Sequence, residues 1–142
     1  MSRIVGDNLK PETRLRMALV RQGLRFRRNV KSLPGSPDFV FGKERLAVFV
    51  HGCFWHGHNG CYRPPKSNTD FWRKKLAANR ERDARARRRL NAMGWETAVV
   101  WECAIYKDAR KLALRIARKT APPSQSSYNL LIYKGNLARK YL

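Results

Sequence analysis

Apolar residues recur at helical spacing near the start of the chain. The residues on one side of this segment are Leu15, Ala18, Leu19 and Gln22. Pro11 suits the first turn of a helix, where its missing amide hydrogen is not needed. Gly23 suits the end, because glycine adopts the left-handed conformation without strain. The pattern predicts an amphipathic helix from Pro11 to about residue 22.

Short apolar runs then predict three strands. Residues 24–30 alternate between apolar and polar types, which is typical of an edge strand. Residues 38–41 and 46–50 are continuous aromatic and β-branched runs, which favour buried strands. Residues 42–43 (Gly-Lys) predict a hairpin turn between them, and residues 33–37 hold the prolines and glycine of another turn.

Two helices and one more strand complete the pattern. Thr69 suits the N-cap of a helix from residue 70 to about 93, and Gly94 suits its end. Residues 97–101 predict a buried strand, and residues 107–119 a second long helix. The order helix, three strands, helix, strand, helix predicts an α/β fold, with a mixed β-sheet flanked by helices.

The length and the charge narrow the class of protein. A chain of 142 residues is one domain by default, here 1–142, with a tail after about residue 120 that has no predicted element. The formal charge of +21 indicates a polyanionic partner, DNA or RNA. An anionic membrane is the alternative, but the arginines do not line one lipid-facing helix. Without a bilayer-spanning run or a signal-peptide pattern, we expect a cytoplasmic, nucleoid-associated protein.

A short segment gathers most of the metal-binding residue types. Residues 51–61 hold all three histidines and two of the three cysteines, and the third is Cys103 at the end of a predicted strand. Thiolate and imidazole are the preferred ligands of Zn²⁺. The predicted structural zinc set is Cys53, His58, Cys61 and Cys103. Spacing alone does not choose the histidine, and free buried thiols are the alternative interpretation.

A zinc site of this kind leaves His51 and His56 unused. Imidazole transfers protons near neutral pH. The predicted hairpin places the Asp38 carboxylate beside the carbonyl of Val50 and the ring of His51. A carboxylate and a backbone carbonyl are oxygen ligands that suit Mg²⁺. Glu12 could add a contact through water. The simpler interpretations are a turn role for Asp38 and a favourable helix dipole for Glu12.

The helix predicted from residue 70 is strongly basic. Nine lysines and arginines lie between Arg73 and Arg89. They form either a solvated face or a stripe that contacts phosphates. Asp83 within this field either pairs with Arg87 four residues on or holds a catalytic histidine in place.

Several stretches of the chain resemble the very-short-patch-repair (Vsr) endonuclease family. The likeness covers roughly residues 1–105, and its most specific parts are Gly-Cys-Phe-Trp-His at 52–56 and Trp-Glu-Cys at 101–103. The other matching stretches are Pro11-Glu12, Leu15-Arg16, residues 33–38 and 48–58, Asp70-Phe71-Trp72, residues 79–83 and Gly94-Trp95. The resemblance implies a restriction-endonuclease-like fold with a structural zinc. It also implies Mg²⁺-dependent nicking of duplex DNA 5′ to the thymine of a T:G mismatch, which arises when 5-methylcytosine deaminates.

The same resemblance assigns roles to single residues. Asp38 and the backbone of Val50 are expected to bind Mg²⁺, and Glu12 to act through metal-bound water. The other active-site positions are His51, His56 and Asp83, and the aromatics expected to wedge into the base stack are Phe54, Trp55 and Trp72. A mismatch lowers the free energy of such unstacking. Core packing is the alternative for the aromatics, although adjacent rings at 54 and 55 cannot both face inward along a strand.

The chain also departs from the family pattern. Many relatives have aspartate at the position of His51, the segment 58–61 has one extra residue, and only ten residues precede Pro11. Two other functions therefore stay open: a sequence-specific restriction-like or homing-type endonuclease, and a zinc-stapled DNA-binding module without catalysis. We expect a monomer on DNA. The recognised bases and an accompanying methyltransferase are not predicted.

Overall fold

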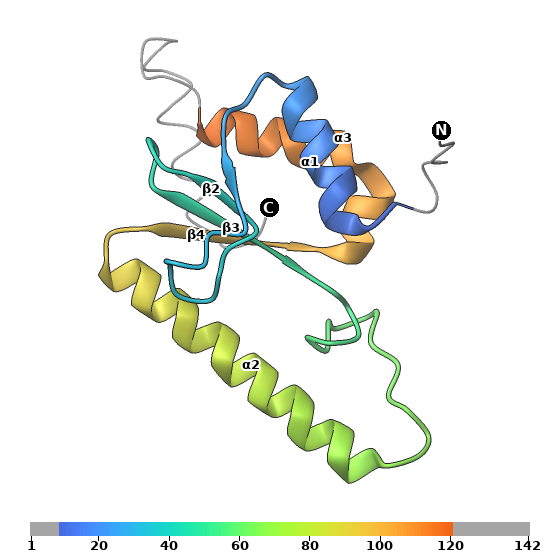
Figure 1. Cartoon of the computed structure of the whole chain (residues 1–142). Helices are drawn as coiled ribbons and strands as arrows, with labels where there is room; N and C mark the ends of the chain where they lie inside the picture. The colour runs from blue at the N-terminus through green and yellow to red at the C-terminus, as the bar shows by residue number, and fades with distance from the viewer. Residues whose placement is uncertain (1–8, 121–142) are drawn as a thin grey trace.

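A mixed four-stranded sheet lies between two layers of helices in the computed structural model, which describes residues 9–120 (Figure 1). The helices are α1 (Pro11–Arg21), α2 (Thr69–Ala92) and α3 (Glu102–Lys119). The strands, in their order across the sheet, are β1 (Arg27–Arg28), β2 (Phe39–Phe41), β3 (Leu46–His51) and β4 (Glu96–Trp101). Strands β1, β2 and β3 pair antiparallel, whereas β3 and β4 pair parallel. The predicted α/β fold with a mixed sheet is confirmed.

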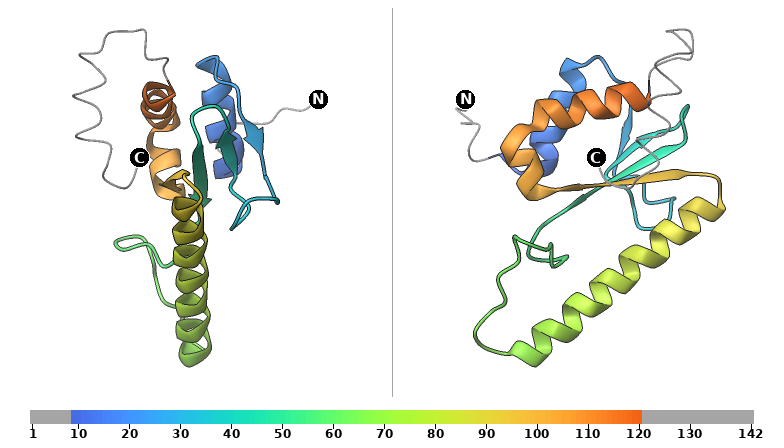
Figure 2. Two further views of the ribbon diagram at one scale, coloured as in Figure 1. Left: turned by 90° about the vertical axis from the view of Figure 1, so that its left-hand side faces the viewer. Right: turned by 180° about the vertical axis from the view of Figure 1, so that it is seen from behind.

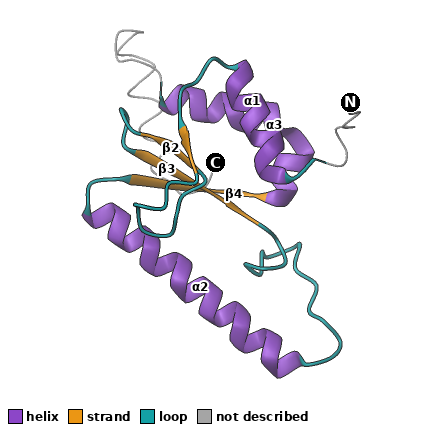
Figure 3. Ribbon diagram, in the orientation of Figure 1, coloured by secondary structure: helices purple, strands orange, loops and turns teal. Residues whose placement is uncertain are grey.

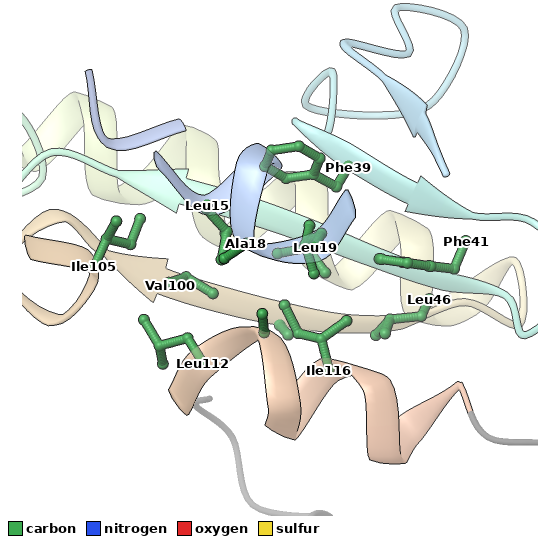
Figure 4. Close-up of a cluster of buried hydrophobic side chains, with 13 residues drawn as sticks. Leu15, Ala18, Leu19, Phe39, Phe41, Leu46, Val100, Ile105, Leu112 and Ile116 are labelled. Carbon is green, nitrogen blue, oxygen red and sulfur yellow. The ribbon is translucent and has the colours of Figure 1, made fainter. Parts of the chain in front are cut away.

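Each face of the sheet carries its own hydrophobic core. Successive side chains of a strand point to opposite faces, and β3 shows this clearly. Leu46 and Val48 pack with α1 and α3 in the larger core (Figure 4), whereas Ala47 and Phe49 pack against Leu90 of α2. Figure 2 shows α2 alone on its side of the sheet, extending past the ends of the strands. The strand thus fixes which residues face α2.

The predicted helix ends and hairpin are confirmed. Gly23 and Gly94 follow α1 and α2 with φ angles of 73° and 89°, the left-handed conformation expected where glycine ends a helix. Residues 42–45 connect β2 to β3, and the Arg45 amide donates to the carbonyl of Gly42 at 3.3 Å. Figure 3 shows these short connections beside the much longer loop that leads to α2.

The first strand is shorter than predicted. The alternating run 24–30 becomes only the exposed pair Arg27–Arg28. Leu24 and Phe26 pack instead against the core beside α1 and α3. Asn29 ends the regular strand because it takes a left-handed conformation with φ 48°. Burial of the two apolar side chains, rather than strand pairing, explains the alternation.

Two helix starts also differ from the prediction. Thr69 is the first residue of α2 rather than its cap, and Asn68 before it is left-handed with no side-chain capping bond. Helix α3 begins at Glu102, five residues before the predicted start at 107. Asp108 is non-helical within α3, and its Oδ1 accepts the Lys111 amide at 3.0 Å. The predicted helix is therefore the second segment of α3, which Asp108 caps locally.

The tail predicted to lack an element after about residue 120 lies outside the described residues. Across residues 9–120, no helix combines the length and the apolar character needed to cross a membrane.

A close approach at Gly35 joins the turn before β2 to α2. Its φ is +77°, and a Cβ built there would lie 2.7 Å from the Cβ of Ala86 and 3.0 Å from the ring of Phe49. Both neighbours belong to the packed layer between the sheet and α2. Only glycine satisfies the backbone angle and the spacing together.

We expect Gly35→Ala to lower the free energy of unfolding by about 2 kcal/mol or more, from left-handed strain and overpacking. Urea denaturation measures the change. Gly42→Ala is the matched control, since no atom lies within 4 Å of its Cβ position. Equal stability of the two variants would contradict the tight packing at Gly35.

Candidate active site and metal centre

The site forms where two parallel strands end together. His51, the last residue of β3, pairs in register with Trp101, the last residue of β4. The loop that follows β3 and the first residues of α3 therefore start from the same edge of the sheet. This register brings Cys103 to residues 53–61 although more than 40 positions separate them along the chain. The amide of Cys53 donates to Oε1 of Glu102 at 3.2 Å and ties the two segments together.

Four sulfur and nitrogen atoms converge at this edge. The ligand atoms of Cys53, His58, Cys61 and Cys103 all lie within 4.8 Å of one another. The Nδ1 of His58 lies 3.6 Å from the sulfur of Cys53 and 3.4 Å from that of Cys103. Zn–S and Zn–N bonds of about 2.3 and 2.1 Å in a tetrahedron give an edge of about 3.6 Å. The donor set and its spacing therefore suit one tetrahedral metal ion.

The thiols in this cluster are costly to ionise without a cation. Burial, together with hydrogen bonds and charges of the neighbouring thiols, raises the pKa of Cys103 to about 12. Burial also raises the pKa of Cys53. A bound metal would reverse both effects, because metal-bound cysteine is a thiolate. Two turn-like bonds, from the His58 amide to the Cys53 carbonyl (2.9 Å) and from the Cys61 amide to the His58 carbonyl (3.1 Å), preform the loop.

A second cluster holds the two remaining histidines and Asp83. The rings of His51 and His56 stack with centroids 3.9 Å apart. Asp83 Oδ2 lies 2.5 Å from Nδ1 of His56 and 4.0 Å from Nε2 of His51. These groups line a cavity of about 590 Å³. The arrangement leaves Nε2 of His56 available to a substrate, because Nδ1 is engaged with the carboxylate.

Burial sets the protonation of this cluster. Burial, reinforced by the adjacent His56, lowers the pKa of His51 to about 4, so His51 is neutral at physiological pH. Burial opposes ionisation of Asp83, but the hydrogen bond with His56 and the nearby positive charges outweigh it and lower its pKa. Asp83 is therefore an anion that can support a positive charge on His56.

One tryptophan separates the two clusters and contacts both. The ring of Trp101 stacks on His58 with centroids 4.0 Å apart. Its edge faces the rings of His51 and His56 at 5.3 and 6.3 Å. A metal that orders His58 would therefore also order the histidines beyond Trp101.

Helix α2 holds the same loop from the other side. Asn79 Nδ2 donates to the Trp55 carbonyl at 2.9 Å, and Arg80 donates to the Gly57 carbonyl at 2.6 Å. Gly57 is left-handed with φ +59°, and a Cβ there would overlap the guanidinium of Arg80. Contacts from α2 to the backbone at 55–57 therefore hold the loop in place.

Asp38 and Glu12 meet elsewhere, at the start of β2. Oδ2 of Asp38 accepts the Val50 amide at 2.7 Å, and both carboxyl groups line a cavity of about 70 Å³. Burial raises the pKa of Asp38 to about 6; the Val50 bond opposes the rise and Glu12 adds to it. Asp38 and the histidine cluster are therefore in separate cavities, joined through the backbone of Val50 and His51. Two adjacent carboxyls beside a backbone segment suit a hard divalent cation.

Aromatic rings gather where the loop meets the first turn of α2. The Phe54 ring lies 5.3 Å from Trp72 and 5.2 Å from Trp55, edge to face in both cases. Trp55 is 50% exposed, so core packing does not explain it. Phe71, which is 59% exposed, extends the cluster through Trp72, and the sequence analysis gave it no role.

The contacts made by Trp101, Glu102 and Arg80 were not predicted from the sequence either. No local signal identifies them, because each acts on a residue more than 20 positions away. The tight Trp-Glu-Cys run was the one hint that residues 101–103 act as a unit.

Comparison with known proteins agrees with this geometry. The profile of the family described as DNA mismatch endonuclease Vsr matches residues 1–63. A type II nicking enzyme, V.XorIIP of Xanthomonas oryzae pv. oryzae, is 50% identical over 105 residues, which are 72% of this chain and 76% of that protein. The DNA mismatch endonuclease Vsr of Escherichia coli K12 is 49% identical over 96 residues, 66% of this chain and 61% of that protein. V.NmeAIP of Neisseria meningitidis, another type II nicking enzyme, is 44% identical over 111 residues, 77% and 79% of the two chains.

The residues matched by the family profile include both the loop at 51–61 and Asp38, which immediately precedes β2. The relatives are named as endonucleases or nicking enzymes, all of which cut DNA. The chain is a DNA endonuclease and belongs to the Vsr family of DNA mismatch endonucleases.

Proposed function

We propose that the protein nicks one strand of duplex DNA on the 5′ side of the thymine in a T:G mismatch, in a reaction that needs Mg²⁺. The proposal rests on two neighbouring groups of side chains, a histidine cluster and a pair of carboxyl groups. Neutral His51 and the His56–Asp83 pair line one cavity, and the Asp38–Glu12 pair lies behind the Val50–His51 backbone. We further infer that the mixed sheet is of the restriction-endonuclease-like type.

Asp38 and the Val50 carbonyl would hold the magnesium ion, with Glu12 reaching it through water. When bound, magnesium supplies an activated water and neutralises charge on the leaving oxygen. The donor set fits, because burial and the neighbouring Glu12 carboxyl raise the pKa of Asp38, and a bound cation would offset both effects. The Val50 amide bond fixes one oxygen of Asp38 and leaves the other for the metal.

His56 is the proton donor that we propose for the leaving 3′ oxygen. Asp83 accepts from Nδ1 and stabilises the imidazolium, so Nε2 can donate. His51 is stacked on His56 and kept neutral by burial, which leaves it free to accept or donate a hydrogen bond at the scissile phosphate.

A zinc ion bound by Cys53, His58, Cys61 and Cys103 would act as a structural staple. The four side chains fill a tetrahedral set, so no position is open to substrate. Its effect on catalysis would pass from His58 to Trp101, on which His58 stacks, and from Trp101 to His51.

The cluster of aromatic side chains around the exposed Trp55 supports recognition of a mismatch. Phe54, Trp55 and Trp72 form a wedge held by Asn79 and α2. Inserting such rings between base pairs costs a few kcal/mol, and the cost is smallest at a weakened pair. We expect one copy of the protein to act on one mismatch.

Asp38→Asn tests the proposed metal ligand. Because burial raises the pKa of Asp38 from 3.8 to about 6, its charged form costs stability as pH rises through that range. At pH 7.5 we expect the variant to lose cleavage, to bind DNA, and to be more stable by about 1–2 kcal/mol. Thermal unfolding with and without Mg²⁺ checks this: Mg²⁺ should stabilise the natural protein and leave the variant unchanged. Normal cleavage by the variant would remove Asp38 from the active site.

The substrate is tested with labelled duplexes whose flanking base pairs are randomised. We expect a duplex with one T:G pair to be nicked at least about 100-fold faster than the same duplex with T:A, since a matched pair resists unstacking by a few kcal/mol. Gel electrophoresis of each labelled strand locates the nick, with Asp38→Asn as the nuclease-free control. Equal rates on both duplexes would instead identify a sequence-specific nicking enzyme.

Cys103→Ser tests the structural metal. The binding energy of such an ion is also folding energy, so we expect lower zinc content, a lower melting temperature and a lower soluble yield. Elemental analysis of the purified protein measures the zinc. Ser67→Ala, an exposed change in the same loop, should bind zinc normally. Full zinc occupancy in Cys103→Ser would exclude this cysteine as a ligand.

A further inference from the structure

An arginine of α2 has a buried nitrogen without a partner. Among residues 9–120, the Nε of Arg87 is the one buried side-chain nitrogen or oxygen that makes no hydrogen bond. Leaving a buried donor unpaired costs about 1–3 kcal/mol, more for a charged group, so each case needs an explanation. The position of Arg87 favours one explanation, in which the substrate supplies the missing hydrogen-bond acceptor.

Arg87 faces the catalytic cavity. It lines the cavity of about 590 Å³ together with His51, His56 and Asp83. It also lines a smaller cavity of about 140 Å³ between Phe49, His51 and α2. Its charge is felt at the site, because it adds to burial and His56 in lowering the pKa of His51.

Other arginines of the same helix are already engaged with the protein. Arg80 donates to the Gly57 carbonyl, and Arg85 and Arg88 pair with Glu81. The pairing of Asp83 with Arg87, one of the two interpretations of the sequence, is not formed in the described residues, where Asp83 pairs with His56. The acid closest to Arg87 along the helix is thus committed elsewhere.

We propose that Arg87 binds a phosphate of the strand that is cut, donating from Nε and a terminal nitrogen to two phosphate oxygens. This inference rests on the proposed nicking reaction. The planar guanidinium matches the geometry of two phosphodiester oxygens. One of these oxygens would accept a hydrogen bond from the buried Nε. Charge on the phosphate oxygens grows during cleavage, so a fixed arginine also stabilises the transition state.

Arg87→Met and Arg87→Lys test the proposal, with Arg110→Ala on the exposed surface of α3 as a control that removes the same charge. A hydrogen-bonded charge contact is worth about 1.5–3 kcal/mol, so we expect single-turnover cleavage to fall about 10- to 100-fold in both Arg87 variants. The control should cut at the natural rate. Thermal unfolding should show both Arg87 variants at least as stable as the natural protein, since the unpaired donor is lost. Unchanged cleavage in Arg87→Met would overturn the proposal while leaving the nicking function intact.

A binding experiment decides the same point without cleavage. Each phosphate around the thymine is replaced in turn by a neutral methylphosphonate, and affinity is measured by fluorescence anisotropy without added Mg²⁺. If Arg87 binds one phosphate, replacing that phosphate weakens the natural protein about tenfold or more and leaves Arg87→Met unaffected. If each methylphosphonate replacement weakens DNA binding by Arg87→Met as much as it weakens binding by the natural protein, the proposal fails. The binding measurement does not depend on whether T:A and T:G duplexes are cut equally. Phosphate binding by Arg87 and mismatch-specific nicking are therefore tested independently.

Discussion

The parallel pairing of β3 with β4 is the constraint on which the site depends. It sets His51 opposite Trp101, so the loop after β3 and the start of α3 leave the sheet from one point. The convergence of the four side chains that could hold a metal, and the stacking of His58 on Trp101, follow from that register. A slip of one residue would reverse every side chain of the strand and separate the clusters.

Acidic residues are scarce in this chain, and several of them serve the site. Of ten acids, Glu12 and Asp38 form the proposed magnesium site, Asp83 orients His56, and Glu102 holds the loop backbone. The remaining excess of positive charge attracts the DNA backbone over the whole surface. Other acids pair with basic side chains away from the site, as Glu81 does with Arg85 and Glu96 with Lys119.

Much of the fold follows from local pattern. The helical spacing at residues 15–19, the apolar runs at 38–41 and 46–50, and the glycines after two helices all predicted elements that the structure contains. These signals work because burial of one face and the backbone freedom of glycine act within a few residues. The prediction was wrong for residues 24–30, for the cap of α2 and for the start of α3, where packing or a local bend decided the outcome.

The sequence by itself determined the chemical inventory: which metal-binding residue types share one loop, and that three cysteines and one histidine would leave two histidines over. Only the tertiary structure decided the partners. Asp83 contacts His56 across 27 positions, and Glu102 bonds the Cys53 amide across 49. It also separated the Asp38–Glu12 pair from the histidine cavity. The physical reason is range: side-chain periodicity is local, whereas contacts between distant segments depend on strand register and on how α2 packs across the sheet.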